Sequence, residues 1–435
     1  MNSLLTFLLF LCIVSSSYGR VFWPSDAFAD ESMINKGELN SGEFWPGNAY
    51  PVSYSGYNGG SVYNVINYGA TGNGKTDDSQ AFLKAWRDVC SSAGAAVPVL
   101  LVPGGRTYLL TNIEFTGPCR SKSIHVQIQG TLLAPRSMNL YRNKDKWIRF
   151  MDINSLVVDG GGVIDGQGFE WWNACEGSGH SCDDRPTALL FHNCNNLQLN
   201  GLKHVNSAKN HISINGCQGV TFSNLQIVAP KDSPNTDGID ISKSQQINIQ
   251  NSVIATGDDC IAINGFCSDI NITGVTCGPG HGISIGSLGK NGIYETVEQV
   301  HVKDCVIRET QNGARIKTWQ GGSGYVRKVT FENITIIAAK NPIIIDQNYD
   351  AMEIDGQKSS SGLQITDITY RGIHGSSAVA DAISFNCNNA NGCTNIVLDN
   401  VKLTSISPGK RAIASCKDVS GRSISSFPTV PCLSS

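Results

Sequence analysis

The stretch Asn235-Thr-Asp-Gly-Ile-Asp-Ile241 carries a short polar cluster that runs directly into an Ile-x-Ile triplet. The same arrangement returns in Gly257-Asp-Asp-Cys-Ile-Ala-Ile263 and Gly280-His-Gly-Ile-Ser-Ile285, and the three triplets begin 22 residues apart. Apolar residues that alternate with period two predict β-strands with one buried face. Because so short a repeat leaves no room for the helix of a βαβ unit, each strand is expected to pair in parallel with its copy one coil away.

A second alternating pair of apolar residues recurs along most of the chain. It begins at Leu197, Val220, Ile247, Ile270, Val300, Val329, Leu363 and Ile396, with weaker copies at Val126 and Leu156. Asn, Gly, Ser and Asp lie between the copies and supply the turns. The pattern predicts an all-β chain folded as a single-stranded parallel β-helix of about ten coils. A β-sandwich is the alternative, but it would not keep a near-constant period over so long a stretch.

The N-terminal region is predicted to consist of a leader and an extension. Residues 4–14 form an apolar run followed by small residues, which predicts a signal peptide over residues 1–19 and hence a secreted protein. The run is too short to span a bilayer. Residues 20–60 show no clear period and remain unassigned, whereas residues 61–435 are predicted to form one β-helix domain.

A capping helix is expected over residues 77–90, where Phe82, Ala85, Trp86 and Val89 form one apolar face. Just before it, Gly69-Ala-Thr-Gly-Asn-Gly-Lys-Thr76 satisfies the phosphate-binding pattern G-x-x-x-x-G-K-[ST]. No series of βα units follows this stretch. A glycine-rich turn that leads into the helix is therefore favoured over a nucleotide site.

Composition excludes some classes of partner. The chain has 435 residues and 40% hydrophobic content, which suffices for a large core. Its 33 basic and 36 acidic residues leave a formal net charge of -3. This balance offers no positive footprint for nucleic acid or an anionic membrane, so any anionic ligand must be held by local charges.

The cysteines indicate an oxidising compartment, because removing Cys12 of the leader from the 15 leaves an even number. Proximity suggests the pairs Cys175–Cys182, Cys260–Cys277, Cys387–Cys393 and Cys416–Cys432. Four cysteines each stand three residues before a repeat and are expected to be buried: Cys194, Cys217, Cys267 and Cys393. Since the chain contains no Cys-x-x-Cys, no zinc site is predicted, and we expect neither a metal nor a cofactor.

Asp237, Asp259 and His281 occupy the same position in three consecutive coils. Neighbouring strands lie about 4.8 Å apart, so these side chains and the adjacent Asp258 would share one face. Carboxylates so close together raise one another's pKa, as general acid catalysis requires. Each cluster alone could be only a turn. Together they predict a catalytic site.

Arg315 and Lys317 flank an isoleucine in a strand-like stretch and therefore point to one face. They could neutralise the carboxylates as a structural ion pair, or they could hold an anionic group of a substrate beside them. The two roles can coexist, and the second is favoured. Tyr349, which closes a Gln-Asn-Tyr stretch, could offer its ring to the face of a sugar.

Four segments resemble the polygalacturonases of glycoside hydrolase family 28, particularly the plant-type members. They are Ser233-Pro-Asn-Thr-Asp-Gly238, Gly257-Asp-Asp-Cys260, Gly280-His-Gly-Ile-Ser-Ile-Gly-Ser-Leu-Gly289 and Arg315-Ile-Lys-Thr-Trp-Gln-Gly-Gly322. The resemblance extends from about Val62 to Cys432. It implies a right-handed parallel β-helix that hydrolyses the α-1,4 linkages between galacturonic acid units of pectin, with inversion at the anomeric carbon.

The resemblance also implies a role for each site residue. Asp258 would protonate the glycosidic oxygen, while Asp237 and Asp259 would position and deprotonate the attacking water. His281 would tune a neighbouring carboxylate, and Asn235 would support the site. The residues expected to bind the sugar next to the cleaved bond are Arg315, Lys317 and Tyr349.

Several functions stay open at this point. Cleavage inside the polymer is preferred to cleavage at its end, and a rhamnogalacturonan or xylogalacturonan hydrolase is the nearest enzymatic alternative. A pectate lyase would need calcium ligands, and a non-catalytic pectin-binding wall protein would be expected to lack a carboxylate. We expect a monomer that acts on polygalacturonic acid in the cell wall and is glycosylated at the Asn-x-Thr sites of Asn271 and Asn333.

Overall fold

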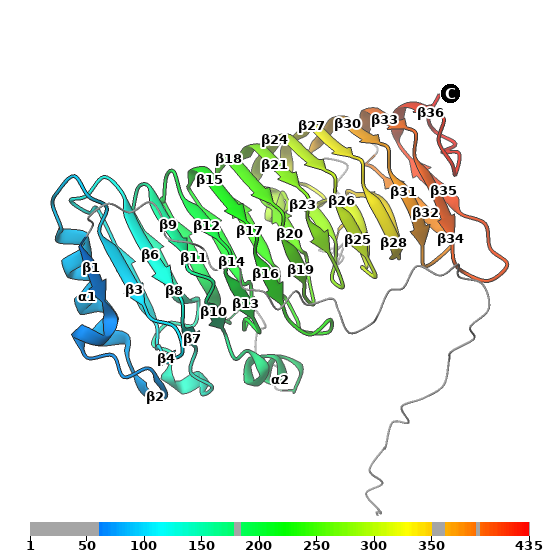
Figure 1. Cartoon of the computed structure of the whole chain (residues 1–435). Helices are drawn as coiled ribbons and strands as arrows, with labels where there is room; N and C mark the ends of the chain where they lie inside the picture. The colour runs from blue at the N-terminus through cyan, green and yellow to red at the C-terminus, as the bar shows by residue number, and fades with distance from the viewer. Residues whose placement is uncertain (1–60, 178–183, 350–361, 389–391, 435) are drawn as a thin grey trace, which may run out of the picture. The chain divides into compact units, whose positions relative to one another are not determined.

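Three long parallel sheets wind around a common interior in the computed structural model (Figure 1). The structure describes residues 61–177, 184–349, 362–388 and 392–434. The predicted leader and the 20–60 extension lie outside these residues. From β3 to β35 the chain passes through the three sheets, called A, B and C below, in turn, so it forms the right-handed parallel β-helix that was expected.

Within each sheet the strands follow one another in chain order. Sheet A contains β1 (Val62–Asn64), β3 (Val99–Val102), β6 (Ile124–Ile128), β9 (Leu156–Asp159), β12 (Gln198–Asn200), β15 (Gln218–Ser223), β18 (Gln245–Gln250), β21 (Cys267–Thr273), β24 (Tyr294–Lys303), β27 (Ser323–Glu332), β30 (Gln364–Arg371), β33 (Cys393–Asp399) and β36 (Val419–Ile424). Sheet B contains β2 (Asn73–Asp77), β4 (Thr107–Leu109), β7 (Thr131–Leu133), β10 (Val163–Asp165), β13 (Lys203–Val205), β16 (Gln226–Val228), β19 (Val253–Ala255), β22 (Thr276–Cys277), β25 (Val306–Arg308), β28 (Thr335–Ala339), β31 (His374–Ser377) and β34 (Lys402–Ser405). Sheet C contains β5 (Ile113–Thr116), β8 (Lys146–Met151), β11 (Thr187–His192), β14 (Ile212–Asn215), β17 (Ile239–Ser242), β20 (Ile261–Ile263), β23 (Ile283–Leu288), β26 (Asn312–Thr318), β29 (Asn341–Asp346), β32 (Asp381–Asn386) and β35 (Ile413–Lys417).

The repeat extends further in both directions than its sequence signal. Sheet A alone has 13 strands. The first coils lack the alternating signal because β3, Val-Leu-Leu-Val, is apolar at every position and a helix interrupts the repeat. The helices are α1 (Ser79–Ser91) and α2 (Phe169–Gly177), with short 3-10 turns η1 (Val65–Tyr68), η2 (Met138–Leu140) and η3 (Lys290–Gly292).

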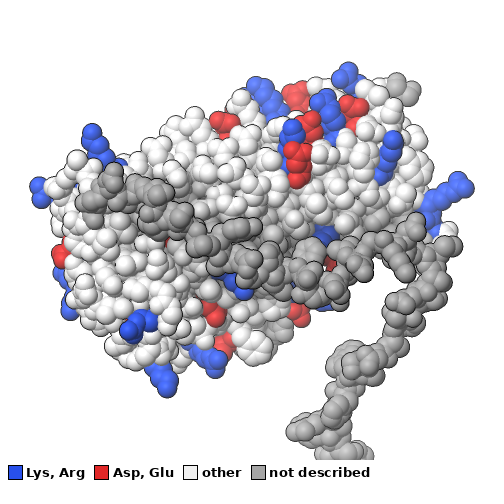
Figure 2. Space-filling view, viewed as in Figure 1, with Lys and Arg blue, Asp and Glu red and all other residues white. Residues whose placement is uncertain are grey.

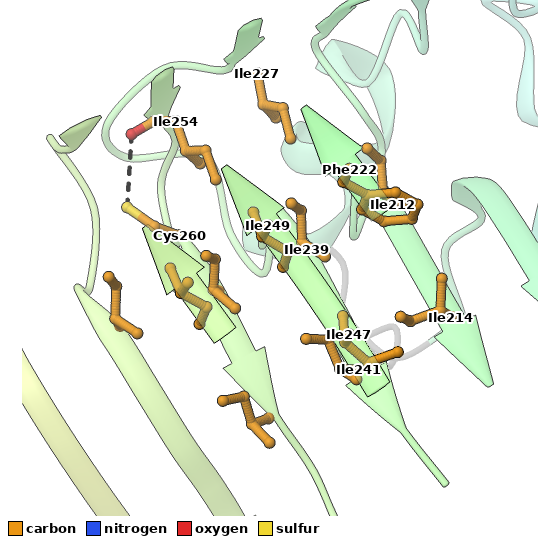
Figure 3. Packing of buried hydrophobic residues seen from close by; sticks show 14 of the residues in the cluster. Ile212, Ile214, Phe222, Ile227, Ile239, Ile241, Ile247, Ile249, Ile254 and Cys260 are labelled. Atoms are coloured by element: carbon orange, nitrogen blue, oxygen red, sulfur yellow. Dashed lines mark hydrogen bonds between the residues drawn. The ribbon is translucent and has the colours of Figure 1, made fainter. Parts of the chain in front are cut away.

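Apolar side chains stack in ladders inside the coils. In sheet C, Ile212 pairs in register with Ile239, and Ile239 with Ile261. All three are fully buried, and Figure 3 shows how the isoleucines of successive coils meet. Left-handed asparagines such as Asn224 and Asn251 turn the chain between strands. The alternation seen in the sequence is therefore the alternation between core and surface.

The helix α1 covers the first coil, close to the range predicted for it. Phe82, Ala85, Trp86 and Val89 are buried, as the helical pattern indicated. The glycine-rich stretch before it begins as a turn and continues into β2: the Asp78 carboxylate accepts hydrogen bonds from the amides of Thr71 and Gly72, at 2.7 and 3.0 Å. The Asp78 carboxylate thus accepts the hydrogen bonds of amides that a bound phosphate would require.

Among the described residues, four disulfides cross-link this fold. Three were anticipated, namely Cys260–Cys277, Cys387–Cys393 and Cys416–Cys432, and the fourth joins Cys90 to Cys119. Cys182, the expected partner of Cys175, lies outside the described residues. The expectation of buried thiols holds for Cys194, Cys217 and Cys267, and Cys305 joins them. Cys393 is also buried, but it is bonded to Cys387.

Charged side chains on the face seen in Figure 2 gather toward the C-terminal part of sheet A, where both signs are mixed. Arg327 pairs with Glu298 at 2.8 Å, and Arg371 pairs with Asp399 at 3.0 Å, each across neighbouring strands. These pairs are exposed and contribute little to stability. No helix among the described residues is long and apolar enough to cross a membrane.

The ladder makes a prediction about stability. Ile241 is fully buried and faces Ile214 and Ile263 in the adjacent coils. The change Ile241→Ala should lower the free energy of unfolding by about 2–5 kcal/mol, because it leaves a cavity between coils. Gln250→Ala, at an exposed position of β18, should change it by less than about 0.5 kcal/mol. Urea unfolding followed by circular dichroism measures both free energies of unfolding. Equal losses in the two variants would contradict the proposal that the isoleucine ladder stabilises the protein.

Candidate active site

The polar clusters lie in the turns that lead from sheet B to sheet C. Asp237 follows β16, Asp258 and Asp259 follow β19, and His281 follows β22. The first isoleucine of each triplet pairs in register with its copy in the next coil. The turns before these strands are consequently stacked, as the 22-residue spacing predicted.

Glycines allow these turns to approach one another closely. A Cβ atom added at Gly257 would lie 2.0 Å from the carbonyl oxygen of Ser233 in the preceding turn. The Gly257 amide instead donates to Oγ1 of Thr236 at 3.0 Å, and that hydroxyl lies 2.6 Å from Oγ of Ser233. Thr236 therefore locks the turn carrying Asp237 to the turn carrying Asp258.

Asp258 lies at the centre of the cluster with three polar partners. Nδ1 of His281 lies 2.8 Å from Oδ1, the Asp259 amide donates to the same oxygen at 2.8 Å, and Nδ2 of Asn235 donates to Oδ2 at 3.4 Å. Burial acts to raise the pKa of Asp258, but the hydrogen bond and charge of His281, together with the Lys317 charge, lower it overall. Its side chain is 17% exposed and remains reachable.

Asp259 is enclosed by cations. Arg315 Nη2 contacts Oδ1 at 2.5 Å and Lys317 Nζ contacts Oδ2 at 2.8 Å, while Oγ of Ser284 donates to Oδ1 at 2.8 Å. The Asp259 side chain is 1% exposed. Burial opposes the charge of Lys317, but Asp259 raises the pKa of that ammonium overall. The structure thus shows the first of the two roles expected for Arg315 and Lys317, the ion pair.

Among the described residues, no cation contacts the carboxylate of Asp237 or of Asp240 directly. Burial, followed by the charges of Asp240, Asp258 and Asp259, raises the pKa of Asp237 well above its usual value. Burial and the charges of Asp259 and Asp258 raise the pKa of Asp240 to about 7. Neighbouring carboxyls therefore differ in proton affinity, the property on which acid and base catalysis depends.

An aromatic wall adjoins the cations. Lys317 Nζ lies 5.1 Å from the ring centre of Tyr349, which packs edge-on against Trp319 at 5.8 Å. Nζ of Lys290 lies 5.1 Å from the Trp319 ring centre. Tyr349 thus lies beside the cluster, as the sequence predicted. The structure adds Trp319, which packs against Tyr349, and Lys290, which lies over Trp319.

The structure brings all the predicted site residues into one region and reveals others. Asp240 and Ser284 are the middle residues of Ile-x-Ile triplets and share an outward row with Arg315. That signal was present in the sequence, since alternate residues share a face. In contrast, no local pattern marked Arg185 or His211. The amide of His211 donates to the carbonyl of Asp237 at 2.8 Å.

The cluster also has the composition of a metal site. Ligand atoms of Asp258, Asp259 and His281 lie within 4.8 Å of one another. However, both oxygens of Asp259 accept hydrogen bonds from cations, and Oδ1 of Asp258 is paired with His281. The donor set is already balanced by the chain's own charges, which fits a metal poorly. The expectation that no metal is needed stays a prediction.

Solved structures share this fold. An endo-xylogalacturonan hydrolase from Aspergillus tubingensis superposes with a TM-score of 0.73 at 24% identity, covering 84% of this chain and 99% of that one. A polygalacturonase from Erwinia carotovora superposes with a TM-score of 0.67 at 24% identity, covering 84% and 97%. At such identities the likeness shows the fold alone.

Sequence relatives are much more similar. A probable polygalacturonase of Arabidopsis thaliana is 48% identical over 377 residues, which is 86% of this chain and 81% of the relative. Polygalacturonase-2 of Solanum lycopersicum is 45% identical over 366 residues, 83% of this chain and 79% of the relative. The model of glycosyl hydrolases family 28 matches residues 90–426. With the stacked carboxylate turns, these matches show that the chain belongs to glycosyl hydrolases family 28.

Proposed function

We propose that the protein is a secreted polygalacturonase that hydrolyses α-1,4-galacturonosidic linkages within pectin, with inversion at the anomeric carbon. The observation that carries the mechanism is the contact of Asp258 with His281 beside a second carboxyl, Asp237, whose pKa is shifted in the opposite direction. Relatives named as polygalacturonases, 41–48% identical to this chain, support the substrate.

In the proposed reaction Asp258 delivers a proton to the glycosidic oxygen. The lowered pKa of Asp258 favours its ionised form in the free protein, so the proton must be supplied by a neighbour. His281 is the neighbour in contact, with Nδ1 at 2.8 Å from Oδ1. The pair can hold one proton jointly, and its transfer to the departing sugar oxygen leaves Asp258 ionised.

Asp237 is the proposed base that takes a proton from the attacking water. Ligand atoms of Asp258 and Asp259 lie within 4.8 Å of one another, whereas inverting enzymes separate acid and base by about 6.5–9.5 Å. Both oxygens of Asp259 are also engaged by cations. The raised pKa of Asp237 makes it the stronger base once ionised. Asp259 then acts by holding Arg315 and Lys317 in place.

The same cations are proposed to bind the substrate. Arg315 and Lys317 bring two cations to the single carboxylate of Asp259, so the carboxylate of a galacturonate unit can be a further partner for them. The ring of Tyr349 beside Lys317 can pack against the sugar, and Asn235 borders the site through Asp258. This charge balance suits a uronic acid polymer.

Internal cleavage is proposed from the position of the cluster along the helix. Asp258 and Asp259 directly precede β20, which is the sixth of the 11 strands of sheet C. Sheet C therefore continues for the same number of strands on both sides, and a long polymer can extend past the cleaved bond in either direction. Exo-cleavage would need one side to be closed.

Secretion to the cell wall, glycosylation and a monomeric state complete the proposal. The four disulfides suit an oxidising compartment. Asn271 and Asn333 are exposed on sheet A and the turn after β27, although Nδ2 of Asn333 donates to Asp304. A shift in electrophoretic mobility after enzymatic removal of N-glycans would test their occupancy.

Substitution of Asp258 tests its assignment as the acid. Asp258→Asn should reduce kcat on polygalacturonic acid by at least about 100-fold, because the amide cannot deliver the proton. Release of reducing ends, without the ultraviolet absorbance of unsaturated lyase products, measures it. Asp269→Asn, the same chemical change at an exposed position of β21, should keep wild-type activity. A fully active Asp258→Asn enzyme would refute the acid assignment.

The pH profile tests the base. Asp237 must be ionised to take a proton, and its pKa is raised, so kcat should fall on acidification at a pH above the value of about 3.9 typical of aspartate. Saturating substrate separates this loss from weakened binding, and reassay at the optimum pH after acid exposure excludes unfolding. A constant kcat down to pH 3.9 or below would rule out Asp237 as the base.

The mode of cleavage predicts how the polymer solution behaves. Internal cuts shorten chains early, so viscosity should halve while only a few per cent of the bonds have released reducing ends. Viscometry and reducing-end assays on one sample give the two curves. Release of small sugars at nearly constant viscosity would show exo-cleavage and contradict the proposal of internal cleavage.

A further inference from the structure

Arg185 is a buried cation that links three successive turns between sheets B and C. It lies just before β11 and is 3% exposed. Its Nη1 donates to the carbonyl oxygens of Ala208 at 2.9 Å and Pro234 at 2.6 Å, and its Nη2 donates to Oδ1 of Asn235 at 2.6 Å. The guanidinium therefore reaches from its own turn to the turn that carries Asp237.

The contact with Asn235 decides which end of that amide faces the active site. An asparagine amide can present either its oxygen or its nitrogen to a neighbour. Arg185 has only donors, so the oxygen of Asn235 must face it. The nitrogen then faces Asp258, to which Nδ2 donates at 3.4 Å. This long contact can shorten when substrate closes the site.

The orientation matters for the proton on Asp258. An N–H donor stabilises the ionised carboxylate, whereas an amide oxygen in the same place would repel it and favour the protonated form. Asn235 has a left-handed backbone conformation with φ 52. The side chain thus starts from a fixed turn, and Arg185 selects one of its two amide orientations.

We propose that Arg185 is a positioning residue that fixes the amide of Asn235 and, through it, the hydrogen bonding of Asp258. The inference rests on the proposed function, in which Asp258 is the acid. A purely structural alternative is that Arg185 only pins the turns to one another. The two differ in whether loss of Arg185 changes the titration of Asp258 and whether Asn235 carries that change.

The test is a double-mutant cycle with Arg185→Met and Asn235→Ala. Each single change should raise the pKa at which the Asp258–His281 pair loses its shared proton and move the alkaline limb of the kcat/KM profile upward by about half a pH unit to one unit, the size expected for one lost hydrogen bond. The double variant should shift no further than either single variant, because both act on one interaction. Arg185→Lys, which keeps a donor for Asn235, should restore most of the wild-type limb.

Controls separate the possible outcomes. Arg371→Met, at an exposed ion pair of sheet A, should leave the limb unchanged. Thermal melting reports folding, and Arg185→Gln replaces the methionine variant if that variant does not fold. If the Arg185 variant has a lower melting temperature but an unchanged alkaline limb of the kcat/KM profile, the inference is overturned and Arg185 only stabilises the turns. Additive shifts in the double variant would overturn it in favour of a direct charge effect.

A measurement without substrate keeps this inference distinct from the proposed function. The Asp258–His281 pair can be titrated by NMR of the imidazole, assigned with His281→Gln. Arg185→Met and Asn235→Ala should shift this titration equally. If the wild type fails to cleave polygalacturonic acid but the shifts occur, the proposed function fails and the positioning role stands. Absence of the shifts in an active enzyme would overturn the positioning role alone.

Discussion

In-register pairing of each strand with its copy one coil away places equivalent residues of successive coils in rows. Inward rows are isoleucine ladders such as Ile212, Ile239 and Ile261, all fully buried. An outward row of sheet C carries Asp240, Ala262, Ser284 and Arg315 in consecutive coils. A slip by one residue would exchange the two faces, so the core that stabilises the protein also keeps this polar row and the turns before its strands in register.

The rows bring like charges together, and the distribution of cations makes them chemically different. Asp259 has both Arg315 and Lys317 in contact, and Asp258 has His281. Asp237 has neither, and its pKa is raised while that of Asp258 is lowered. Three aspartates thus acquire three different electrostatic surroundings from their partners, because a nearby cation favours the ionised form and a nearby carboxylate disfavours it.

The turns, rather than the strands, carry the carboxylates that are proposed to react. A strand fixes a side chain only as inward or outward, whereas a turn can aim it at a neighbour in the next coil. Such turns need buried hydrogen bonds to stay in place. Thr236, Gly257 and Arg185 supply these bonds between successive turns. A large, regular core supports this precision, and the disulfide Cys260–Cys277 joins the coils of Asp259 and His281.

Sequence periodicity alone determined the parallel β-helix, the shared face of the clusters and the common side of Arg315 and Lys317, because alternation and spacing are local properties of the chain. The motif resemblance then supplied the family. The first coils were not detected because β3 is apolar at every position, without alternation, and α1 interrupts the repeat. Only the tertiary structure decided which cation contacts which carboxylate, since side-chain reach across coils has no sequence pattern. For the same reason, Arg185, 50 residues from Asn235, became visible only in three dimensions.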